Sequence, residues 1–168
     1  MLLTGCVSSL SAQQSFWKED FSAGKLPDGW MIVDSTKSAK CEWIVTDQPY
    51  PGSFQFEQQA PPIASTCRGY HMQFRPGVVT GEEITKWNQR EEYPNGYFQT
   101  SAIDCAGKNN VVFKFQHLFR WNNWFTGKRA GLWVGVSNDG VNWKEYNVMD
   151  KIPAATQLHA PVNEEINI

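Results

Sequence analysis

Hydrophobic and polar residues alternate most regularly between Val111 and Trp121. Aromatic side chains and one histidine fall on one face of this stretch, and most of its polar side chains fall on the other. A period of two is typical of an antiparallel strand with one buried face. The stretch therefore predicts a half-buried strand with His117 in its buried row. No carboxylate has a sequence reason to stand beside His117, so we expect a core histidine bonded to the backbone.

A second alternating segment predicts a hairpin. Its inward-facing positions are Leu132, Val134, Val136, Trp143 and Tyr146. The turn Asn138-Asp139-Gly140 separates the two halves of this row, and Asp and Gly tolerate the positive φ angles of a tight hairpin. The sequence therefore predicts two short antiparallel strands joined at this turn.

The segment Glu19–Trp30 starts with two acidic residues and continues with turn-forming ones. Two glycines and a proline lie between the large apolar side chains of Phe21 and Trp30. This pattern predicts a short edge strand that stops, reverses in an aromatic-anchored turn and re-enters the core. Together, the short strands and turns predict an all-β antiparallel sandwich.

Length and composition agree with one domain. The chain has 168 residues, of which 41% are hydrophobic and 14% aromatic, so it can bury one substantial core. Its 15 Lys and Arg against 17 Asp and Glu give a net charge of −2, and no basic run interleaves with aromatic residues. A nucleic-acid surface is therefore not indicated. No stretch after residue 12 approaches the ~20 apolar residues of a membrane-spanning helix.

Residues 1–12 are interpreted as the end of an export signal. Ala12 is a small residue of the kind that precedes a signal-peptidase cut, whereas Leu3–Cys6 matches a lipobox in which Cys6 would carry the lipid. Both alternatives predict a secreted or cell-surface protein, with residues 13–168 forming the domain.

The pattern E-D-F-x-x-G-x-x-P-x-G-W at residues 19–30 resembles the opening of a group of jelly-roll domains. These are the cleaved-adhesin, MAM-like and choice-of-anchor J domains of secreted bacterial surface proteins. Residues 61–72, 97–107 and 134–143 also resemble elements of this group, although Ala102 stands where the group usually has proline. The resemblance implies an antiparallel jelly-roll β-sandwich over residues 13–168, with its last strands missing beyond Ile168.

The resemblance also implies a structural calcium ion. Relatives hold calcium between an acidic residue of the first strand, a following acidic loop and a terminal D-D element. Glu19, Asp20 and Asp34 occupy the matching positions in this chain. Their carboxylate oxygens suit a hard cation, but three acidic side chains are too few for a complete site.

Three cysteines remain when Cys6 is set aside, an odd number for an oxidising compartment. Cys41 and Cys67 flank loops that can meet at one end of a sandwich, so we expect a disulfide between them. Cys105 would then stay unpaired. The alternative is that all three are buried thiols.

Candidate ligand-binding residues follow the strongest strand. They are Trp121, Asn123, Trp124 and Phe125. Flat aromatic faces beside amide donors suit sugar rings, and residues at the end of a strand are often on a loop tip. The alternative is that these aromatic rings close the end of the core.

The sequence does not favour catalysis. It has no C-x-x-C, H-E-x-x-H or G-x-S-x-G motif, and the glutamate pairs within residues 82–92 lie in a charged run typical of a solvated loop. We therefore expect a non-catalytic extracellular binding or adhesion module of a larger protein, with a carbohydrate or protein ligand. The alternative is an accessory β-sandwich domain of a secreted protease or glycoside hydrolase.

Overall fold

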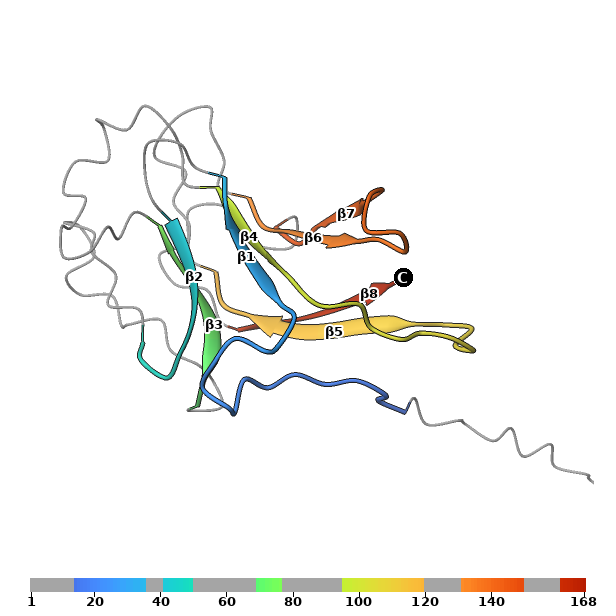
Figure 1. Cartoon of the computed structure of the whole chain (residues 1–168), viewed down its shortest axis with the longest axis horizontal. Coiled ribbons are helices and arrows are strands. Elements are labelled where there is room, and N and C mark those ends of the chain that lie inside the picture. Colours follow the sequence, from blue (N-terminus) through green and yellow to red (C-terminus); the bar gives the residue numbers. More distant parts are fainter. Residues whose placement is uncertain (1–13, 36–40, 50–68, 77–94, 120–130, 150–160) are drawn as a thin grey trace, which may run out of the picture.

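The computed structural model describes residues 14–35, 41–49, 69–76, 95–119, 131–149 and 161–168. Within these ranges every regular element is a β-strand, and there is no helix. The strands pair as four antiparallel two-stranded ribbons, β1 with β4, β2 with β3, β5 with β8 and β6 with β7 (Figure 1). The all-β antiparallel prediction is therefore confirmed for this part of the chain, although the ribbons do not join into a closed sheet. A search of the same ranges finds no helix with the length and apolar character to cross a membrane.

One tryptophan joins the first two ribbons. β1 (Met31–Asp34) pairs with β4 (Gly96–Gln99), and β2 (Cys41–Thr46) pairs with β3 (His71–Pro76). The ring of Trp43 on β2 meets Phe98 on β4 edge-on, with centroids 4.9 Å apart. Trp43 Nε1 donates a hydrogen bond of 3.1 Å to the Gly96 carbonyl oxygen. The same side chain therefore fixes the two ribbons by packing and by a directional bond.

The segment before β1 adds its aromatic rings to this contact. Trp30 stacks on Phe98 with centroids 5.7 Å apart and an interplanar angle of 2°, and it also stacks on Trp17. Phe21 meets Trp30 edge-on at 5.7 Å. We call the connected rings the aromatic cluster. Its members are Trp17, Phe21, Trp30, Trp43, Phe74 and Phe98.

The aromatic-anchored turn is confirmed, but the edge strand expected at its start is wrong. Residues 14–20 carry no strand, and Phe21 has a φ of +57°. The Glu19 carboxylate accepts the backbone N–H of Phe21, and the Asp20 carboxylate accepts that of Ser22. These acidic side chains offer the backbone a local partner in place of a neighbouring strand, so the chain curls instead of extending.

The predicted half-buried strand is confirmed as β5 (Val112–His117), which pairs with β8 (Val162–Asn167). On the exposed face, Lys114 forms an ion pair of 2.7 Å with Glu165 across the ribbon. The inner face carries the alternate side chains of both strands. These are Phe113, Phe115, His117, Val162, Glu164 and Ile166.

The predicted hairpin is confirmed as β6 (Trp133–Val136) paired with β7 (Lys144–Asn147). Its connection is longer than a tight turn, because it comprises residues 137–143. Asp139 organises this loop by accepting the backbone N–H groups of Val141 and Asn142 at 2.8 and 2.7 Å. Gly140, with a φ of +72°, supplies the left-handed residue.

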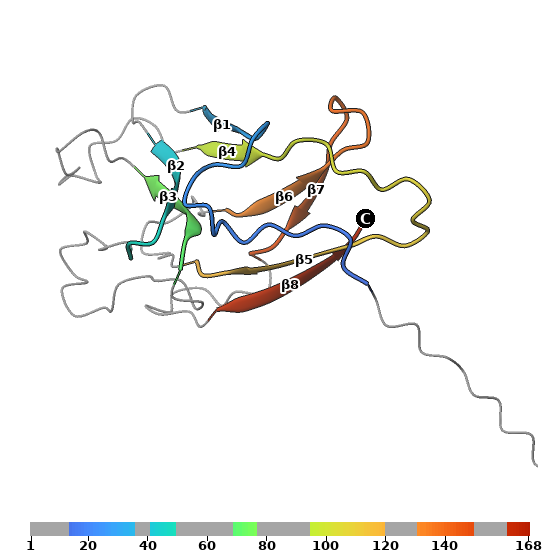
Figure 2. The same cartoon turned by 60° about the horizontal axis from the view of Figure 1, so that its bottom comes forward.

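The best-buried apolar side chains of the described ranges lie where this hairpin meets the β5–β8 ribbon. Val148 and Ile166 are 3% and 6% exposed, and Met149 packs against Phe119 and Leu132. Figures 1 and 2 both show the β6–β7 hairpin beside β5 and β8. The Tyr146 hydroxyl donates a hydrogen bond of 3.1 Å to the Asn167 carbonyl oxygen, which links β7 to β8.

Candidate functional site

The aromatic residues expected to bind a ligand lie outside the described residues. They are Trp121, Asn123, Trp124 and Phe125. Their role stays a prediction.

The structure places the three carboxylates expected to bind calcium, and it shows local partners of Asp20 and Glu19 in the turn before β1. Asp20 pairs with Lys18 at 3.0 Å, and the hydrogen bond from Ser22, together with this lysine, lowers the pKa of Asp20 to about 2. Glu19 accepts a backbone N–H in the same turn. Asp34 is the last residue of β1 and pairs across the ribbon with Gly96. Across the described ranges, no three His, Cys, Asp or Glu side chains gather as metal ligands. Calcium binding stays a prediction.

Of the cysteines, the structure characterises Cys105 most fully. Cys105 is an exposed free thiol, so the alternative in which all three thiols are buried is wrong for this residue. Cys67 lies outside the described residues, and Cys41 is placed through its backbone at the start of β2. The disulfide between Cys41 and Cys67 therefore stays a prediction.

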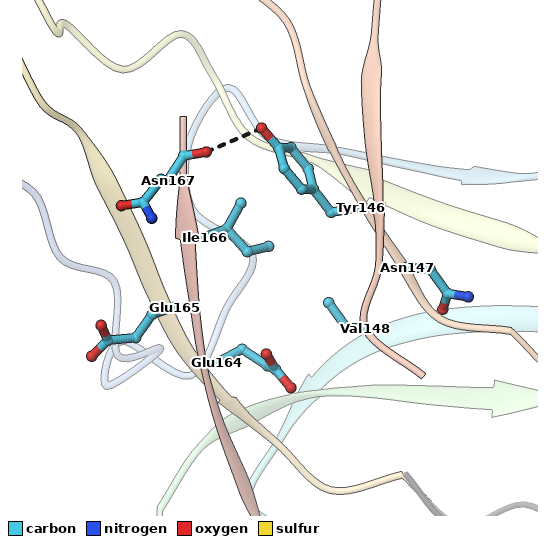
Figure 3. A pocket seen from close by; sticks show the side chains of 7 residues that line it. All are labelled: Tyr146, Asn147, Val148, Glu164, Glu165, Ile166 and Asn167. Atoms are coloured by element: carbon cyan, nitrogen blue, oxygen red, sulfur yellow. Dashed lines mark hydrogen bonds between the residues drawn. The ribbon is translucent and has the colours of Figure 1, made fainter. Parts of the chain in front are cut away.

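A groove of about 320 Å³ runs between β7 and β8. Tyr146 and Val148 border it from one side and Ile166 from the other, as Figure 3 shows. These side chains continue the apolar core toward the surface. Glu164 also lines the groove, yet it is only 2% exposed and so presents little of its carboxylate to solvent.

His117 and Glu164 form a buried pair on the inner face of the β5–β8 ribbon. The Nε2 atom of His117 lies 3.7 Å from Oε1 of Glu164, and the two side chains are 10% and 2% exposed. The expectation that no carboxylate stands beside His117 is therefore wrong, although its place in the buried row is confirmed. The contact links β5 to β8 on the buried face of their ribbon.

A second surface lies on the outward side of the β6–β7 hairpin. Because side chains alternate along β6, Trp133 and Gly135 point away from the core, and their partners across the ribbon are Asn147 and Glu145. Trp133 is 55% exposed. Trp143, which was expected to point inward, is 44% exposed, so that expectation is wrong. We call this surface the tryptophan face. Its members are Trp133, Gly135, Trp143, Glu145 and Asn147.

Two glycines make room for the two indoles. A Cβ at Gly131 would overlap the Cη2 atom of Trp133, and one at Gly135 would lie 3.2 Å from the Cε3 atom of Trp143. Each indole therefore rests against backbone at a point where any other residue would carry a side chain. This arrangement keeps both rings on the outside of the hairpin, where much of their surface meets solvent.

Part of this face was readable from the sequence. The inward row Leu132, Val134 and Val136 obliges Trp133 to point outward, and a glycine stands two residues before and two residues after it. Trp143 gave no such signal, because it lies in the connecting loop and not in the paired strand.

No protein-family model, curated protein or solved structure matches this chain. The resemblance to the jelly-roll groups stays a prediction. Chemically, the tryptophan face offers two aromatic surfaces and the Glu145 carboxylate, together with the amide of Asn147, whose Oδ1 also accepts the backbone N–H of Met149 at 2.9 Å. These groups can pack against a solute and hydrogen-bond to it.

Proposed function

We propose that this chain is a non-catalytic binding module of a secreted or cell-surface protein, and that its ligand is a carbohydrate. The observation that carries the proposal is the tryptophan face, where Trp133 and Trp143 are 55% and 44% exposed. A sugar ring has an apolar C–H face and a rim of hydroxyl groups. An indole can pack against the apolar C–H face. The Glu145 carboxylate and the Asn147 amide can hydrogen-bond to the hydroxyl groups.

The composition of the face favours a sugar over a protein ligand. A stable protein interface covers about 800 Å² on each partner and has a contiguous apolar centre. In the tryptophan face, the two indoles are flanked by the polar side chains of Glu145 and Asn147 on β7. Small-ligand sites combine aromatic side chains with a small number of polar groups, and the tryptophan face has both.

We further propose that the ribbons belong to a jelly-roll sandwich that is exported from the cell. Two observations support this. Trp43 packs the β2–β3 ribbon onto the β1–β4 ribbon, as expected where two layers face one another. Residues 1–12 have the character of an export signal.

The test is a glycan array probed with the full chain, followed by isothermal titration calorimetry with the glycans retained. We expect saturable binding to one class of glycan, and we expect mass spectrometry to recover that glycan unchanged. Retention of no glycan would overturn the carbohydrate proposal, as would binding only to a deglycosylated surface protein. Release of shortened or hydrolysed products would overturn the non-catalytic part.

A further inference from the structure

We infer that the tryptophan face binds a linear, uncharged oligosaccharide of at least about three sugar units, laid along β6. This inference rests on the proposed carbohydrate-binding function and specifies the length, charge and orientation of the ligand.

The length follows from the spacing of the two indoles. The ring of Trp133 lies against Gly131 and that of Trp143 lies against Gly135, four residues further along the chain. Four residues of extended chain span about 13 Å. A single pyranose ring is shorter than this, so one sugar cannot contact both indoles. A ligand that covers Trp133 and Trp143 needs at least one further unit between them.

The charge follows from the residue at the centre of the face. Glu145 lies directly across the ribbon from Gly135, beside the ring of Trp143. The neighbouring lysine does not offset it on this side, because Lys144 points to the other side of β7 and its Nζ lies 4.9 Å from the centroid of the Tyr146 ring. A carboxylate accepts hydrogen bonds from hydroxyl groups and repels a second carboxylate. Neutral sugars are therefore favoured over uronic acids.

The hairpin also holds the face in its binding shape before a ligand arrives. The β6–β7 ladder fixes the backbone beneath Trp133, and Asp139 closes the connecting loop that carries Trp143. A preformed surface loses little conformational entropy on binding. Affinity should consequently depend on how many sugar units touch the two rings, and a length series can measure this dependence.

The experiment is calorimetry with a neutral homologous series, from the monosaccharide to the hexasaccharide, of the glycan retained on the array. We expect the affinity to rise at least tenfold between the disaccharide and the tetrasaccharide and then to level off. Trp133→Ala and Trp143→Ala should each lower the affinity for the hexasaccharide by roughly tenfold or more and flatten the length dependence. The control Tyr97→Ala removes an aromatic side chain that is 49% exposed on β4, and it should change nothing.

Two further variants keep both indoles instead of removing them. One tests the position of the Trp133 ring, and the other tests the charge of Glu145. Gly131→Ala keeps Trp133 but places a Cβ where its ring lies, so the ring must move and binding should fall as in Trp133→Ala. Circular dichroism verifies that each variant is folded, and if Gly131→Ala does not fold, the two tryptophan variants decide. Glu145→Gln should raise the affinity for the matching uronic-acid oligomer by several-fold and leave the neutral one within about twofold.

The outcomes distinguish the two proposals. Absence of binding to every glycan overturns the proposed function itself. Binding that is equal for the monosaccharide and the hexasaccharide, or that is unchanged in both tryptophan variants, overturns this inference and leaves the proposed function standing. Preference of the unmodified chain for uronic acids overturns the assignment of charge.

Discussion

Replacing Trp30 with alanine is expected to lower the free energy of unfolding by about 3 kcal/mol. Replacing a core tryptophan with alanine costs about 3–5 kcal/mol, and the half-buried position of Trp30 places it at the lower end. The aromatic cluster gives an independent estimate. Trp30 contacts Trp17, Phe21 and Phe98. Each ring pair contributes about 0.5–1.5 kcal/mol beyond area burial, so the three together account for at least about 1.5 kcal/mol.

Urea denaturation followed by far-ultraviolet circular dichroism measures this loss, and a thermal melt provides a second readout. For a domain of this size, 3 kcal/mol corresponds to a fall in Tm of about 6–12 °C. The matched control is Trp133→Ala, the same substitution at a side chain that is 55% exposed. We expect that control to change the stability by less than about 0.5 kcal/mol.

A double-mutant cycle tests the contact itself. Trp30 and Phe98 stack nearly parallel, with an interplanar angle of 2°. Their alanine variants should therefore show a coupling energy of about 0.5–1.5 kcal/mol. A loss below about 1 kcal/mol for Trp30→Ala, or equal losses for Trp30→Ala and the exposed control, would refute the role given to the aromatic cluster.

Three further predictions concern pH, thiol chemistry and metal. Hydrogen bonds from Asn142 and Val141 hold the pKa of Asp139 far below its usual 3.8, so this group adds stability above pH 3.8 that is lost as the pH falls below it. The stability advantage over Asp139→Asn, measured by urea denaturation from pH 7 to pH 2, should shrink below about pH 4, and a constant advantage would contradict this. Cys105 should react with a maleimide reagent in the folded protein, and mass spectrometry that finds this thiol unlabelled would show that it is covered or paired. Calcium should raise Tm only slightly, because three carboxylates are too few for a complete site, and Asp20→Ala should remove this small rise; an equal rise in that variant would exclude Asp20 as a ligand.

Local patterns in the sequence were sufficient to predict some strands. The alternation in β5 depends only on neighbouring side chains, and the structure confirms it from Val112 to His117. The start of the chain failed for an equally local reason, because the carboxylates of Glu19 and Asp20 bind nearby backbone N–H groups and form a turn. That competition between turn and strand is not visible in hydrophobic periodicity.

The partners of side chains across the fold were harder to predict. Glu164 stands beside His117 only because β8 pairs with β5, and no local pattern specifies that pairing. Trp143 was misplaced because a tight turn would have extended the strand through it, whereas the longer loop leaves it outside the ladder and frees it from strand alternation. The outward position of Trp133 was not predicted, although the inward row of Leu132, Val134 and Val136 implies it.

The pairing of β5 with β8 determines the order in which the chain can fold during synthesis. Lys114 and its cross-strand partner Glu165 are separated by 51 residues, whereas β6 and β7 are joined by a short loop and can pair at once. Until β8 emerges, β5 keeps an open edge. Docking of β8 is therefore expected to be slower than closure of the β6–β7 hairpin, because it closes the longer of these two loops. Before that step, the main hazard is association of β5 with another copy of the chain.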